Sequence, residues 1–233
     1  MNTDLSAARR VIQRGRVLVL LGLLGEAGIF VRALKFTPVE ATQGLAQKIF
    51  YLHVPAAWSA LFLSFGLVGV SSALFLWLED PRLDRFAASS AEVGIAFGTV
   101  MLTTGPIWAK PIWGTWWSWD MRLSMTLLLY LLFLGYLALR SAIDDRGERG
   151  RYSAVIGVMA LVLVPFIHLT VYLFRTLHPQ PIVLKPSAPS LPPEMLITLL
   201  SAIAVAGLLY LGFVTMRYGI TLAREAHEEA RHE

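Results

Sequence analysis

The chain has 233 residues, of which 56% are hydrophobic and 15% are charged, and its mean hydropathy is +0.60. This composition excludes a water-soluble globule and indicates a membrane protein. The net charge of +4 does not call for a nucleic-acid partner, because arginines beside anionic lipid explain it. The sequence has no cysteine, so any metal chemistry must use histidine, carboxylate or methionine.

Apolar runs of membrane-spanning length recur along the chain. Each is close to the ~20 residues that a helix needs to cross the hydrocarbon core. Helices are the only open-chain structures that pair every backbone group in lipid. We therefore predict an all-α, polytopic membrane protein with six transmembrane helices, forming a single domain over residues 1–233. The six runs lie near residues 17–34, 56–78, 93–109, 121–140, 153–174 and 195–216.

The distribution of basic residues predicts the orientation. Most arginines lie in the N-terminal segment, the second and fourth loops and the C-terminal tail. Cytoplasmic loops are enriched in lysine and arginine, so both termini are predicted to be cytoplasmic. The other three loops, residues 35–55, 110–120 and 175–194, then face outward.

Two histidines flank the predicted outer edge of the membrane. His53 stands in IFYLHVPAAW, just before the second run, and His178 stands in LFRTLHPQP, just after the fifth. A neutral imidazole in such a place can be an axial ligand to haem iron. The alternative is an interfacial histidine that bonds only to water or to a carbonyl group.

The third outward feature is the stretch KPIWGTWWSWDMRL, which holds Trp113, Trp116, Trp117 and Trp119. An interfacial aromatic belt needs only one or two indoles at each helix end, so this density favours a binding role. If residues 113–120 are helical, Trp113, Trp117 and Asp120 share one face, with Trp116 beside them and Trp119 pointing away. A planar hydrophobic macrocycle would stack on that face.

Charged residues flank the proposed aromatic platform. Arg122 could pair with an acidic substituent of such a ligand, because its forked guanidinium matches a carboxylate; Lys110 is the second candidate for this role. Asp120 is predicted to accept hydrogen bonds from nearby N–H groups or to pair with Arg122.

Polar residues within the spans raise further expectations. Ionisable groups in lipid are costly, so Glu26 and His168 are candidates for function. For His168, a hydrogen bond that supports the site above it is favoured over direct ligation. Gly94 and Gly98 form a small-x-x-x-small pair, which predicts close helix packing.

The segments TPVEATQG, IFYLHVPAAW, KPIWGTWWSWDMRLS and RTLH resemble those of the cytochrome c maturation protein C family, also called haem exporter protein C. These proteins belong to a wider class of haem-handling membrane proteins with a Trp-rich WWD segment. The chain differs from the family at Leu173 and Phe174, where an aromatic pair is usual.

The resemblance implies that the chain presents haem b, as transient cargo, on the outer face of a bacterial inner membrane. Carried over by motif, the haem-contacting residues are Trp113, Trp116, Trp117, Trp119, Asp120 and Arg122, with His53 and His178 as axial iron ligands. The implied partners are a two-part ABC transporter (the A and B components), a small membrane protein (the D component) and a membrane-anchored periplasmic haem chaperone (the E component). The chain itself is expected to catalyse no reaction.

Two interpretations from other classes remain open. A b-type haem subunit of a quinone-linked redox enzyme would place paired histidines inside facing helices, at bilayer depth. A plain permease subunit would use the tryptophans only as anchors and would bind no chromophore.

Overall fold

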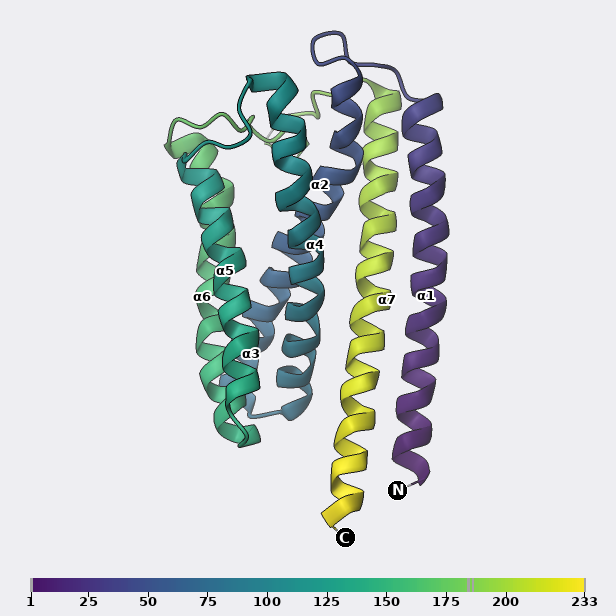
Figure 1. The fold of residues 1–233 in the computed structure, drawn as a ribbon, viewed down its shortest axis with the longest axis vertical. Helices are drawn as coiled ribbons and strands as arrows, with labels where there is room; N and C mark the ends of the chain where they lie inside the picture. Colours follow the sequence, from purple (N-terminus) through teal and green to yellow (C-terminus); the bar gives the residue numbers. More distant parts are fainter. Residues whose placement is uncertain (1, 184, 186, 233) are drawn as a thin grey trace.

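The computed structural model describes the backbone of residues 2–183, 185 and 187–232, and the side chains of the same residues except 2–4 and 232. Over these residues the chain is all-α, with one isolated β-bridge between Glu40 and Gly44. The elements in chain order (Figure 1) are α1 Asn2–Lys35, η1 Leu45–Ile49, α2 Phe50–Trp58, η2 Ser59–Phe65, α3 Gly66–Leu78, α4 Pro81–Trp113, α5 Met121–Ala142, α6 Arg146–Leu173 and α7 Pro193–His232.

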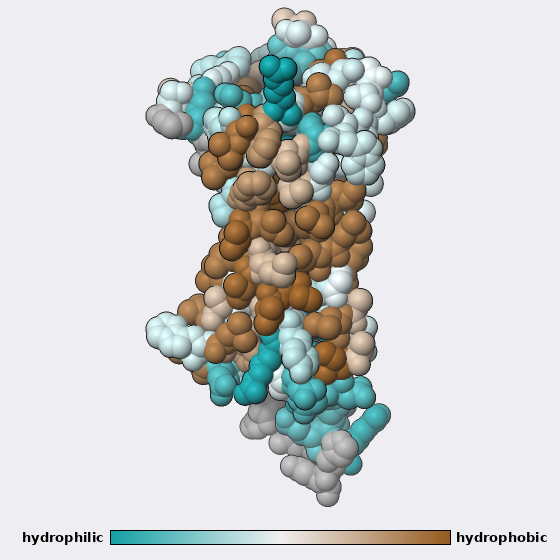
Figure 2. All heavy atoms as spheres, turned by 90° about the vertical axis from the view of Figure 1, so that its left-hand side faces the viewer, coloured by the Kyte–Doolittle hydropathy of each residue, from teal (hydrophilic) through white to brown (hydrophobic). Residues whose placement is uncertain are grey.

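The predicted six spans are confirmed. In the described chain, six helices are long and apolar enough to cross a membrane, the second running without a gap from η1 to α3. Both termini lie at one end of the bundle, and the connections 36–44, 114–120 and 174–192 lie at the other (Figure 1). Apolar side chains form a band between two hydrophilic ends (Figure 2), as a bilayer requires.

The three connections are shorter than the sequence predicted. Residues 45–55, expected in a loop, are helical, and α4 continues to Trp113. His53 therefore lies on α2 and not in a loop. The second span is longer than its most apolar part. Hydropathy alone therefore places its more polar first turns in a connection.

The second span is interrupted by a π-helical segment. Pro55 lies inside α2 and has no N–H to donate to the preceding turn. The helix then widens into η2, where buried Ser59 and Ser64 lie among apolar residues. Pro55 and the π-helix together bend the outer part of the span away from a straight course.

The longest helices, α1 and α7, pack side by side in antiparallel orientation (Figure 1). Glycines allow this close approach. A Cβ atom at Gly15 would lie 2.6 Å from the backbone nitrogen of Met216, and one at Gly212 would lie 2.7 Å from that of Val19. Small residues let helix backbones meet in lipid, where no hydrophobic effect drives the helices together.

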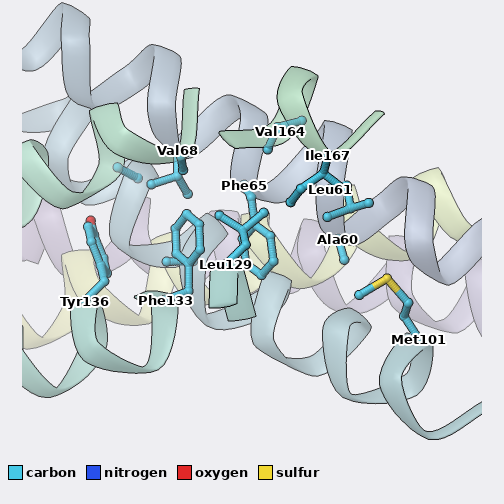
Figure 3. Close-up of a cluster of buried hydrophobic side chains, with 13 residues drawn as sticks. Ala60, Leu61, Phe65, Val68, Met101, Leu129, Phe133, Tyr136, Val164 and Ile167 are labelled. Atoms are coloured by element: carbon cyan, nitrogen blue, oxygen red, sulfur yellow. The ribbon is translucent and has the colours of Figure 1, made fainter. Parts of the chain in front are cut away.

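The central core joins η2, α3, α4, α5 and α6 (Figure 3). The rings of Phe65 and Phe133 stack with centroids 4.0 Å apart. Gly94 gives Phe65 its space, because a Cβ atom there would lie 2.5 Å from Phe65 Cε1. At Gly98 a Cβ atom would lie 2.9 Å from the ring of Tyr130. The packing role predicted for the two glycines is confirmed.

Gly94→Leu should destabilise the bundle, because the added side chain overlaps Phe65 and disturbs its stack on Phe133. Overpacking of this kind costs about 1–3 kcal/mol. Gly135→Leu is the matched control, since nothing lies within 4 Å of a Cβ atom at that glycine. We expect a lower thermal midpoint in detergent for Gly94→Leu only; equal shifts in both variants would contradict the packing argument.

Candidate functional site

A cavity of about 300 Å³ lies toward the end of the bundle that carries the three connections. It brings together His53, His178 and Arg122, which are far apart in the sequence, and adds His168 from α6. Its other walls come from the connection 36–44, η1, α2, η2, α4, α7, residues 179–183 and Leu191. Most of these residues are apolar, with the few polar groups that are typical of a small-molecule site.

His53 is held in one orientation by α4. Its Nδ1 lies 3.0 Å from Thr104 Oγ1, and Thr104 Oγ1 donates to the carbonyl oxygen of Val100 at 2.7 Å. The Thr104 hydroxyl has therefore used its proton, so it accepts a hydrogen bond from His53 Nδ1–H. The Nε2 lone pair then remains available.

In His178, as in His53, Nδ1 carries the proton of the neutral ring, but its hydrogen-bond acceptor differs. Its Nδ1–H donates to the carbonyl oxygen of Pro179 at 2.9 Å, which leaves the Nε2 lone pair available. Burial, together with the positive charge of Arg122, lowers the pKa of His178 to about 3, so the ring is neutral at physiological pH. His178 also interacts electrostatically with His53. Both rings thus use Nδ1 in a hydrogen bond to an oxygen atom.

Asp120 joins the segment 114–120 to the segment that carries His178. Its Oδ1 accepts from the N–H of Leu123 at 3.0 Å and caps α5. Its Oδ2 accepts from the N–H of Leu177 at 3.2 Å. The expectation that Asp120 accepts from nearby N–H groups is confirmed. No ion pair with Arg122 within 4.0 Å is found among the described residues.

Arg122 extends from the first turn of α5 into the cavity. Its Nη1 donates to the carbonyl oxygen of Ile167 at 3.3 Å, near the outer end of α6. Its remaining N–H groups have no hydrogen-bond partner among the described residues, so they can bind an acidic group in the cavity. Lys110 is not placed for this role, because its Nζ donates to the carbonyl oxygen of Gly114 at 2.9 Å.

The prediction that residues 113–120 form a helical tryptophan platform is wrong. α4 ends at Trp113 because Gly114 adopts a left-handed conformation with φ 74°, and residues 114–120 are not helical. Trp113, Trp117 and Asp120 therefore do not share a helical face. The side chains of Trp116 and Trp119 are 57% and 79% exposed. None of the four tryptophans at positions 113, 116, 117 and 119 lines the cavity.

Two other tryptophans, which sequence reasoning did not select, line the cavity instead: Trp58 and Trp108. The edge of Trp108 meets the His53 ring with centroids 5.8 Å apart, and its Nε1 donates to Gln43 Oε1 at 3.1 Å. A signal was present in the sequence. Thr104 and Trp108 are four residues apart on one helix and therefore share a face, which here is the face toward His53.

The two intramembrane candidates, His168 and Glu26, lie in different cavities. His168 lines the cavity, with its ring edge-on to Phe62 at 5.8 Å. The hydrogen bond expected for it is absent among the described residues. Glu26 lies in a second cavity of about 470 Å³, lined by α1, α2, α4 and α7, and so takes no part in the histidine site.

The fold and this site define a class: a polytopic membrane protein with three histidines and an arginine around one cavity near one end of its bundle. Residues 5–232 match the family described as CcmC, "Heme exporter protein C". The chain belongs to the haem exporter protein C family, and it is a multi-pass protein of the inner membrane.

Curated relatives agree with this membership. The "Heme exporter protein C" of Haemophilus influenzae is 35% identical over 209 residues, which cover 89% of this chain and 82% of that protein. The protein of the same name from Bradyrhizobium diazoefficiens is 36% identical, over 74% of this chain and 65% of its own length. The "Heme exporter protein C" of Escherichia coli K12 is 38% identical, over 61% of this chain and 58% of its own length.

Asp120→Ala should free the segment that carries His178. Losing a helix cap costs about 1 kcal/mol of stability, and losing the Leu177 bond should also speed amide hydrogen exchange in residues 174–183. Asp145→Ala is the control, since Asp145 caps α6 at the other end of the bundle by accepting from Glu148 N–H. Equal exchange of residues 174–183 in both variants would show that Asp120 does not hold this segment.

Proposed function

We propose that this chain holds haem in the histidine cavity and presents it on the outer face of the inner membrane for the biogenesis of c-type cytochromes. The observation that carries the proposal is the pair formed by His53 and His178. Each ring has its Nδ1 engaged in a hydrogen bond, and both residues line one shared cavity. Haem iron, already bound by four porphyrin nitrogens, needs one or two such axial ligands.

The lining of the cavity suits the rest of the haem molecule. Phe50, Phe62 and Trp108 offer apolar surface to the macrocycle, whose burial is worth ~25 cal/mol per Å². Arg122 would neutralise a propionate through N–H groups that no described protein atom uses. Both imidazoles are neutral, so haem b can be bound and released as cargo without a proton being moved.

The positions of the connections suit transfer to a partner. The positive-inside rule places both termini in the cytoplasm, so the cavity opens toward the periplasmic side. There the exposed rings of Trp116 and Trp119 give a periplasmic haem chaperone, the E component, an apolar surface to contact. The chaperone makes its own bond to haem. The A and B components of the ABC transporter, with the small membrane protein that is the D component, complete the proposed complex.

The direct test is to purify the protein from haem-replete membranes and record its absorption spectrum. We expect the band of a six-coordinate, low-spin haem in the wild type, which His53→Ala and His178→Ala should each convert to a high-spin or weakly bound form. His227→Ala, on the cytoplasmic extension of α7, is the control. A wild type without a haem band, or variants that bind and hand over haem normally, would refute the proposal. Quinol-driven reduction of the haem at catalytic rates would instead favour a redox subunit.

Arg122→Gln should remove the preference for haem over its dimethyl ester, which lacks the charged propionates. A charge-assisted hydrogen bond is worth about 1.5–3 kcal/mol, so the wild type should bind haem at least about tenfold more tightly than the ester. Arg175→Gln is the control, because Arg175 lies in the segment 174–192 but does not line the cavity. If Arg122→Gln keeps the wild-type preference in a titration, Arg122 does not contact a propionate.

A further inference from the structure

His168 is the third histidine that lines the cavity. His53 lies on α2, in the span that begins at Leu45, and His178 lies in the connection that follows α6. His168 lies five residues before the outer end of α6, which is about 7.5 Å of helix, so it is more than one turn inside its span. Haem iron bound to His168 would therefore lie farther from the outer connection than iron bound to His178.

A single guanidinium lies close to all three rings. Arg122 interacts electrostatically with His53, His168 and His178. It also bonds to the carbonyl oxygen of Ile167, the residue before His168. An acidic group held by Arg122 would thus bring the molecule that carries it within reach of each histidine in turn.

The His168 ring differs from the other two in its bonding. His53 and His178 each use Nδ1 in a hydrogen bond, whereas neither nitrogen of His168 has a partner in the described part of the chain. Its ring neighbour is Phe62 of the π-helical segment, which offers only an apolar edge. His168 is half-buried and lines the cavity, and ionisable residues inside transmembrane segments commonly mark functional sites.

We infer that His168 is a third ligand for haem iron, used for haem that lies farther inside the bundle than the iron site at His178. This inference rests on the function proposed above. Outward movement of the haem exchanges one axial bond for another: the iron–His168 bond breaks, and a bond to Nε2 of His53 or His178 forms. The iron keeps its oxidation state, and the exchange itself transfers no proton, because each imidazole binds iron through an unprotonated nitrogen.

The test compares variants that lack the two outer ligands. The double variant His53→Ala/His178→Ala should still bind added haemin, with the absorption and resonance Raman signature of a five-coordinate, single-histidine haem. Adding His168→Gly should abolish that signature and lower haemin affinity at least about tenfold. Adding His227→Gly instead should change nothing.

Rescue separates ligation from folding. Free imidazole should restore the five-coordinate spectrum of the triple variant that carries His168→Gly, because it can occupy the space of the lost ring. A merely structural role for His168 would not respond in this way. If the double and triple variants give the same spectrum and affinity, or if imidazole restores nothing, His168 is not a ligand.

The wild type distinguishes the two proposals. Suppose that haem binding by the wild type depends on His53 and His178, but the double and triple variants have the same spectrum and haemin affinity. This result overturns the role of His168 and leaves presentation by the outer pair intact. A wild type that binds no haem overturns both.

Discussion

The absence of water from the hydrocarbon core is the constraint on which this structure depends. Each backbone N–H and C=O must be paired inside the protein, which requires continuous helices and moves irregular chain to the ends of the bundle. The π-helical segment after Pro55 is an exception within a span, and two of its residues, Leu61 and Phe62, line the histidine cavity. The backbone is thus irregular at membrane depth where it adjoins the candidate site.

The two outer histidines are supported by parts of different stiffness. His53 is fixed by a helix and by Thr104 on the neighbouring helix α4. His178 lies in an irregular connection, which the bond from Leu177 N–H to Asp120 ties to the start of α5 and which Ile182 and Val183 pack against the core. The backbone at His53 is thus fixed by helical hydrogen bonds, whereas the backbone at His178 is fixed by contacts of its connection.

The six spans could be predicted because hydropathy and length decide them locally, and so could the grouping of three connections at one end. His53, His178 and Arg122 could be named from residue type and motif. Their convergence on one cavity, with Thr104 and Trp108 behind them, depends on packing between α2, α4 and α6 that no local pattern encodes. The prediction of a helical tryptophan face was wrong for a local reason, because Gly114 ends α4 and Asp120 caps the start of α5 only six residues later.

The tryptophans therefore fall into two groups with different surroundings. Trp58 and Trp108 line the cavity, where their apolar surface can cover a bound macrocycle. Trp116 and Trp119 project from the connection 114–120, which a hydrogen bond from Thr115 to the carbonyl oxygen of Trp117 holds in a turn. Exposed indoles beyond a helix end bury their area only when another surface covers them. Under the function proposed above, the haem acceptor supplies that surface, and the exposed indoles of the WWD segment are its contact.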